Sequence, residues 1–254
     1  MDPYQHYQNE YSAYLGRLKD RFHLSLTVMM AWVVVLGGFF LAQDHWFSTQ
    51  AFAIRPLQPE GLIGILTAPL LHGSMGHLSS NAFAFLIVGT LAGSLYPRAT
   101  LRAWPIIWLG SGLGTWFISL GGHHIGASGI TVGLMFFLIA QGLRRRDKVS
   151  LGALMLAMFF FGGMVLSFLP QEQGISWEYH LSGAVFGFLT GLAFAGLDER
   201  APKRLYSWDI ETDSEEMTTD NELDLPISPE IPVIWHRPEH ERGNNVIPLD
   251  RHRH

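Results

Sequence analysis

The sequence predicts an all-α integral membrane protein built as a bundle of six transmembrane helices. Of its 254 residues 48% are apolar, the mean hydropathy is +0.18, and the apolar residues gather in long uncharged runs. A helix needs about 20 mostly apolar residues to cross a hydrocarbon core of roughly 30 Å. We expect six spans, at residues 24–43, 77–97, 103–121, 127–143, 150–169 and 179–197.

The first and the middle runs need separate justification. Residues 24–43 follow three cations, as in a signal peptide, but 20 uncharged residues exceed a typical signal core and no small-residue cleavage site follows. We therefore expect a retained first span. Residues 103–143 form one uncharged stretch that is too long for a single helix. The Gly121-Gly122 pair predicts the break between the third and fourth spans.

The distribution of Lys and Arg predicts the orientation. If the N-terminus is cytosolic, the predicted outer loops hold only Arg55. The predicted inner segments then hold the following cations: Arg17, Lys19, Arg21, Arg98, Arg102, Arg144, Arg145, Arg146, Lys148, Arg200, Lys203 and Arg204. Both termini are therefore expected in the cytosol. We predict a multi-pass protein that resides in a bacterial inner membrane.

Three regions follow from this topology: a cytosolic segment at residues 1–23, the membrane domain at 24–197 and a tail at 198–254. The tail is rich in acids and proline, and such a composition favours disorder. The first outer loop, residues 44–76, is too apolar for a free aqueous loop. We expect it to lie in the membrane interface or to pack against the bundle.

Several classes of function are disfavoured by composition. The chain has no cysteine, so disulfides, thiolate metal sites and a cysteine nucleophile are excluded. It has no basic stripe of the kind that binds nucleic acid. His123 and His124 lack carboxylate or cysteine partners at a spacing suited to zinc, so they are expected to be a loop pair. We expect no metal and no cofactor.

Three polar residues on three predicted spans lie at one depth. With a rise of 1.5 Å per residue, Ser128 lies about 24 Å above the inner end of its helix, His180 about 26 Å and Asn81 about 24 Å. All three then lie roughly 5 Å below the outer edge of the hydrocarbon core. Polar groups inside spans are rare and commonly functional. Taken singly, Ser128 could bond its own helix, His180 could be interfacial and Asn81 could join helices.

Glycines offer a way for two of these helices to meet. Gly183, Gly187 and Gly191 recur every four residues on the face that carries His180, and Gly129 and Gly133 follow Ser128. Such stripes let helix backbones approach closely in lipid. Such stripes also occur where they only pack helices together. The spacing alone therefore does not decide between helix packing and a site that brings His180 to Ser128.

The same residues resemble the motifs of the rhomboid family of intramembrane serine proteases. His72, followed by His77 and Asn81 in a His-x-x-x-Asn pattern, is similar to that family's second-helix motif. Gly126, Ala127, Ser128 and Gly129 resemble its serine motif, and His180 with Gly183 and Gly187 resembles its histidine motif. The order of the motifs and the predicted topology agree with the family over about residues 24–197.

The resemblance implies a serine endopeptidase that cleaves single-span membrane proteins near their extracytoplasmic end, with the lipid bilayer as its surroundings. Ser128 would be the nucleophile and His180 its general base. Asn81, His77 and the Ser128 backbone amide would hold the oxyanion. His72 would be structural and would support the first loop.

Two positions depart from the family pattern. Many rhomboids have Trp-Arg in the first loop, where this chain has Ile63-Gly64, and many have an aromatic residue one turn after the serine, where this chain has Val132. These departures concern the anchoring of the loop and the orientation of the histidine. The first alternative is therefore a catalytically inactive relative that binds membrane proteins. A transporter or channel is a second alternative, but it predicts charged spans, which the sequence lacks.

Overall fold

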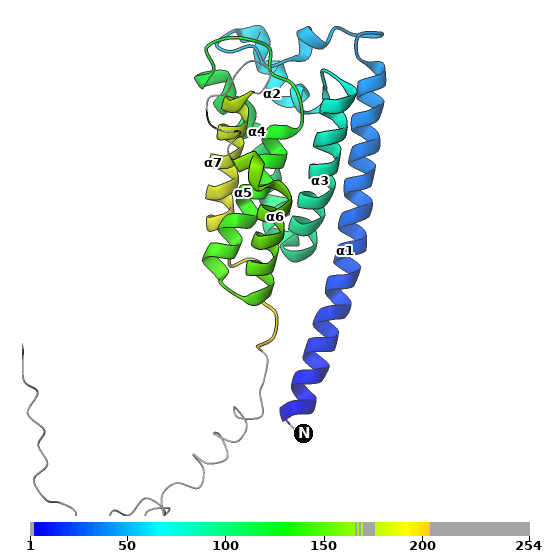
Figure 1. Ribbon diagram of the computed structural model, residues 1–254, viewed down its shortest axis with the longest axis vertical. Helices are drawn as coiled ribbons and strands as arrows, with labels where there is room; N and C mark the ends of the chain where they lie inside the picture. Colours follow the sequence, from blue (N-terminus) through cyan, green and yellow to red (C-terminus); the bar gives the residue numbers. More distant parts are fainter. Residues whose placement is uncertain (1–2, 166, 168, 170–175, 204–254) are drawn as a thin grey trace, which may run out of the picture. The chain divides into compact units, whose positions relative to one another are not determined.

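The computed structural model describes residues 3–165, 167, 169 and 176–203, and these residues form an all-α structure. Six long helices are α1 (Pro3–Ala42), α3 (Met75–Leu95), α4 (Pro97–Ile118), α5 (Ser128–Arg145), α6 (Lys148–Val165) and α7 (Trp177–Ala193). Each overlaps one of the six predicted spans. Figure 1 shows them side by side, with α1 along the edge of the bundle beside α3. The predicted tail lies outside the described residues from residue 204 onward.

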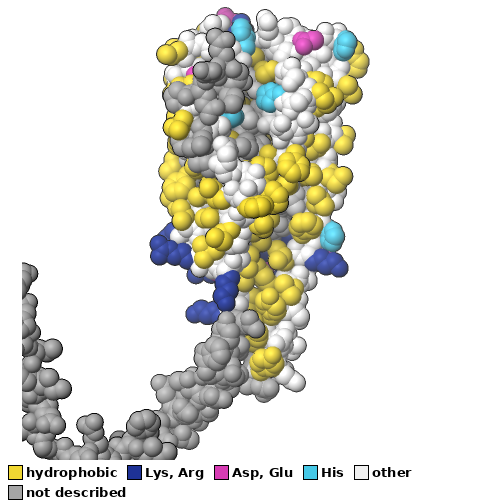
Figure 2. All heavy atoms as spheres, viewed as in Figure 1, with side chains coloured by type: hydrophobic (Ala, Val, Ile, Leu, Met, Phe, Trp, Pro, Cys, Tyr) yellow, Lys and Arg dark blue, Asp and Glu magenta, His cyan; other side chains and the backbone are white. Residues whose placement is uncertain are grey.

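Helix α1 begins earlier than its apolar run. It spans 40 residues and crosses the predicted boundary at residue 24 without a break. Helices α1 and α3 are long and apolar enough to cross a membrane when length and composition are tested, and α6 is a shorter apolar helix. On the face in Figure 2, hydrophobic side chains cover the flanks, and Lys and Arg gather toward the lower end.

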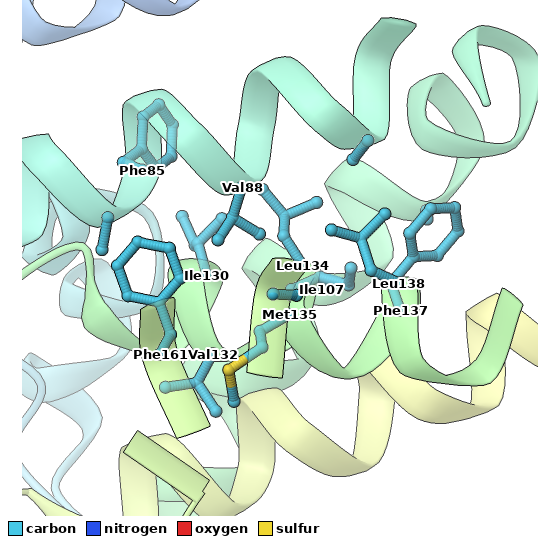
Figure 3. Close-up of a cluster of buried hydrophobic side chains, with 14 of the residues drawn as sticks. Phe85, Val88, Ile107, Ile130, Val132, Leu134, Met135, Phe137, Leu138 and Phe161 are labelled. Carbon is cyan, nitrogen blue, oxygen red and sulfur yellow. The ribbon is translucent and has the colours of Figure 1, made fainter. Parts of the chain in front are cut away.

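Helix α5 is the centre of the bundle. It packs against α7, α4, α6 and α3, and most of its residues are buried, whereas α1 contacts chiefly α3. Its apolar side chains interdigitate with Phe85 and Val88 of α3, Ile107 of α4 and Phe161 of α6 (Figure 3). The helix that carries Ser128 is thus held on several sides by close packing.

The predicted break between the third and fourth spans is confirmed, because α4 ends at Ile118 and α5 begins at Ser128. The first loop contains η1 (Thr49–Phe52), η2 (Pro59–Ile63), α2 (Gly64–Thr67) and η3 (Ala68–Leu70). It packs against the bundle, which agrees with one of the two expectations for this loop. Ile54 exchanges both backbone hydrogen bonds with His124, N to O at 3.0 Å each. The loop therefore pairs with the segment that leads into α5.

The two Trp-Arg positions are filled differently here. Ile63 is partly exposed, and Gly64 packs so closely against the backbone of Ala53 and Ile54 that no side chain fits. Anchoring comes instead from Trp116 of α4. Its indole Nε1 donates to the Gln58 carbonyl at 3.0 Å, and its carbonyl accepts from Leu57 N at 3.1 Å.

A polar clasp, formed by Asp198 and Arg145, joins α4, α5 and the segment after α7 at the end of α5 that lies opposite Ser128. The Asp198 carboxylate accepts from the backbone N–H groups of Arg98 and Ala99 at 3.0 and 2.9 Å, which caps the start of α4. The buried Arg145 guanidinium donates to the carbonyls of Asp198 and Glu199 at 3.1 and 2.7 Å. The C-terminal end of α5 is therefore bound to the segment that follows α7.

Candidate active site

A cavity of about 510 Å³ opens where α3, α5 and α7 begin, on the same side of the bundle. Of the predicted site residues, the structure brings Ser128, His180, His77 and Asn81 around it. The described residues that line it are Gly73, Ser74, His77, Asn81, His123, Ile125, Ser128, Ser167, Ser176 and His180.

The contact between α5 and α7 explains why Ser128 and His180 share this cavity. A Cβ added to Gly183 would overlap the Gly129 carbonyl, and one added to Gly187 would overlap the Gly133 carbonyl. The two glycine stripes therefore face each other at backbone contact, as the spacing allowed. Ser128 immediately precedes one end of this contact, and His180 lies three residues before Gly183 on the same helix face.

Ser128 is the first residue of α5, so its backbone N–H has no acceptor within the helix. The turn before it requires Gly126, whose φ of +111° is unfavourable for residues with a side chain. A Cβ at Gly126 would also lie 2.7 Å from the imidazole of His77 and 3.4 Å from Asn81 Nδ2. Glycine at this position lets both donors come close to the serine turn.

Asn81 and His77 lie on successive turns of α3. Ser74 caps that helix by accepting from His77 N at 3.1 Å, a cap that the Ser residue before an apolar run could have indicated. Asn81 is 4% exposed, and its Nδ2 has no hydrogen-bond partner among the described residues. A buried amide donor without a partner is costly, and its place on a cavity wall makes it available to an anion bound there.

His72 lies outside the cavity and supports it from behind. It is fully buried, its Nε2 lies 3.5 Å from Ala127 N, and its ring centroid is 5.1 Å from that of His77. Burial, with a smaller contribution from the charge of His77, lowers the pKa of His72 to about 4. Gln43 at the end of α1 binds both backbone groups of His72. The structural role expected of His72 agrees with these contacts.

The two loop histidines differ. His123 is exposed at the cavity, while His124 is buried. His124 Nε2 lies 2.9 Å from Ser119 Oγ and its Nδ1 lies 2.8 Å from Ser176 Oγ. Burial lowers the pKa of His124, although the Glu178 carboxylate opposes that shift. His124 therefore ties the segment before α5 to the start of α7. Among the described residues no cluster of three or more His, Cys, Asp or Glu could hold a metal ion.

Two site residues escape prediction from the sequence. Ser167 contacts His180, with Oγ 2.8 Å and the carbonyl oxygen 3.3 Å from Nδ1. Tyr179 is fully buried beneath Gly129, where it fills the space that a side chain would need. Val132, the position of the family aromatic, belongs to the main hydrophobic cluster (Figure 3). Neither Ser167 nor Tyr179 has a spacing that a sequence pattern would mark.

Comparison with known proteins decides the family. The profile of the Rhomboid domain matches residues 59–196, which is more than half of the chain. The chain belongs to the rhomboid family. Rhomboids are membrane proteins, and the long apolar helices of this chain agree with that setting. All the residues that we place in the candidate site lie within the matched range.

Relatives extend the comparison across bacteria and a virus. Proteins of Mycobacterium bovis and Mycobacterium tuberculosis are 39% identical to this rhomboid over 161 residues, which is 58% of this chain and 65% of theirs. The chain thus spans a little under two thirds of the length of these mycobacterial relatives. A protein of Acanthamoeba polyphaga mimivirus that carries a provisional rhomboid name is 27% identical over 141 residues, or 52% of this chain and 75% of its own.

Proposed function

We propose that this rhomboid is an intramembrane serine endopeptidase with Ser128 as nucleophile and His180 as general base. One observation carries the proposal. A single cavity is lined by a serine at a helix N-terminus, a histidine from the helix packed against it, and a buried amide donor without a partner among the described residues. An acyl-transfer site needs these three groups together.

The chemistry follows from these groups. His180 accepts the Ser128 proton as Oγ bonds to the scissile carbonyl carbon. The negative charge that develops on the carbonyl oxygen is held by Asn81 Nδ2, His77 and the backbone N–H of Ser128. His180 then gives its proton to the leaving amine, and the peptide bond breaks to leave an acyl-enzyme. Water, deprotonated by the same histidine, releases the acyl group from Ser128.

The proposed topology has six spans and places both termini in the cytosol. Each of the six long helices overlaps one of the six uncharged runs, which supports six spans, and the cations of the predicted inner segments support this orientation. The cavity then opens on the extracytoplasmic side, roughly 5 Å within the hydrocarbon core. The proposed setting is a bacterial inner membrane, because the relatives that are 39% identical are bacterial proteins and the family is membrane-embedded.

The substrates that fit this site are single-span membrane proteins. A peptide bond within a helix is a poor target, so the substrate must unwind, which is easiest near Gly or Pro. Membership of the rhomboid family implies a small residue next to the scissile bond. We expect cleavage after a small residue near the extracytoplasmic end of the substrate span.

The test is cleavage of a generic single-span substrate by the purified protein in liposomes, with products located by mass spectrometry. Ser128→Ala and His180→Ala should each abolish cleavage, and the double variant should be no worse than either because the pair acts as a unit. A fluorophosphonate should label the wild type and not Ser128→Ala. A wild type that neither cleaves nor becomes labelled would favour the inactive membrane-protein-binding alternative, and cytosolic cleavage would refute the topology.

A further inference from the structure

The imidazole of His180 is held by a residue outside its own helix. Its Nδ1 lies 2.8 Å from the hydroxyl oxygen and 3.3 Å from the carbonyl oxygen of Ser167, just beyond the end of α6. The His180 and Ser167 residues are only 8% and 9% exposed, and both line the cavity that holds Ser128. Two oxygens of one residue therefore face one ring nitrogen in a buried setting.

This contact selects the tautomer of the ring. A carbonyl oxygen can only accept a hydrogen bond, so its position favours the form of His180 in which Nδ1 carries the proton. Nε2 then has a free lone pair, which is what a general base for a serine hydroxyl needs. In that form the Ser167 hydroxyl oxygen, which lies closer to Nδ1 than the carbonyl oxygen does, accepts the Nδ1–H hydrogen bond. When Nε2 gains a proton, this bond strengthens because the ring is then positive.

The family aromatic that would stack on the histidine is absent here. Its position holds Val132, which is fully buried within the main hydrophobic cluster of the bundle. An orienting group must come from elsewhere. The third member of a serine protease triad performs this task by fixing the tautomer and direction of the imidazole.

We propose that Ser167 is the positioning residue of His180 and takes the place of that stacking aromatic in this chain. The proposal rests on the proposed function, because it needs His180 to act as a base. It assigns no contact between Ser167 and substrate, so Ser167 should affect the chemical step and leave substrate binding unchanged.

The test is steady-state cleavage in liposomes by Ser167→Ala and Ser167→Thr beside the wild type. We expect Ser167→Ala to lower kcat about ten- to a hundredfold, as for a lost hydrogen bond to a developing charge, with KM within about threefold. Ser167→Thr keeps the hydroxyl and should restore kcat to within about threefold. Ser79→Ala is the matched control and should leave kcat unchanged. Ser79 lies near the end of α3 that borders the cavity, and among the described residues its hydroxyl donates only to the Gly76 carbonyl.

The outcomes separate the two proposals. Full kcat in Ser167→Ala, a change in KM instead of kcat, or no recovery in Ser167→Thr would overturn the positioning role while Ser128→Ala is inactive. Cleavage by Ser128→Ala would instead overturn the proposed function itself. Fluorophosphonate labelling gives a second readout, since Ser167→Ala should slow the labelling of Ser128 by a similar factor.

Discussion

On the proposed function, adding one methyl group at Gly187 should lower the rate of cleavage about a hundredfold without removing any group that takes part in the chemistry. In the structure a Cβ at this position would overlap the carbonyl oxygen of Gly133 on the facing helix. Backbone atoms cannot rotate away as a side chain can. Relief therefore requires α5 and α7 to move apart, by on the order of 1 Å to reach ordinary van der Waals contact.

The magnitude follows from where Gly187 lies. His180 is seven residues away, about 10 Å along the same helix, so a shift at Gly187 is carried to the imidazole. A displacement of about 1 Å between reacting groups can cost roughly a hundredfold in rate. Overpacking costs about 1–3 kcal/mol, offset by up to about 1 kcal/mol from the better helix propensity of alanine. We expect Gly187→Ala to lose about a hundredfold in kcat and only a few degrees in Tm.

Gly152→Ala is the matched control, because a Cβ at this α6 position meets nothing within 4 Å. Both variants should be assayed for cleavage of the same substrate in liposomes and melted in detergent. Gly152→Ala should keep the activity of the wild type. If Gly187→Ala also keeps more than half of the wild-type kcat, the glycine contact does not set the geometry of the site and our argument is wrong.

Three further predictions test other parts of the structure. Asn81→Ala should lower kcat about a hundredfold with little change in KM, because its contact forms with the oxyanion; a rise in KM alone would make Asn81 a binding residue. Asp198→Asn should destabilise the fold by about 1–3 kcal/mol through the weakened cap of α4, whereas Asp20→Asn, at an exposed position, should not. Equal melting temperatures for these two variants would contradict the stabilising role of the clasp. Because the pKa of His72 is lowered from 6.5 to about 4, its contribution to stability is complete above pH 6.5 and is lost as pH falls toward 4, by up to about 1.4 kcal/mol per pH unit. Between pH 7 and pH 5 the melting temperature should therefore fall less steeply in His72→Gln than in the wild type. An equal fall in both proteins would show that His72 is not the source of this pH dependence.

The six long helices could be predicted because uncharged runs of spanning length leave a direct trace in the sequence. The start of α1 could not be predicted from hydropathy, because residues 3–23 are helical but not apolar. The Lys and Arg residues of the predicted inner segments indicate only the orientation of the chain in the membrane. That Arg145 turns inward and binds the carbonyls after α7 depends on tertiary packing, which a charge count cannot show.

The candidate site was predictable to the extent that its residues lie on helices. Depth along a helix follows from the constant rise, so the sequence alone suffices to align Ser128, His180 and Asn81. Ser167 could not be placed in this way, because it lies after the end of α6 and 13 positions before His180, where no helical spacing connects the two. Gln43 likewise looks like the mere end of an apolar run, although its amide fixes the backbone of His72.

The close contact between α5 and α7 also bears on when activity can arise during synthesis. Ser128 and His180 are 52 positions apart in the chain, and the clasp that joins their helices needs Arg145 together with residues 198 and 199. At about 5–20 residues per second, a ribosome takes roughly 3–10 s to add the base after the nucleophile. On the proposed mechanism, a growing chain carries an inert serine throughout this interval. The enzyme therefore cannot cleave its neighbours at the insertion site before its own last helix has entered the bundle.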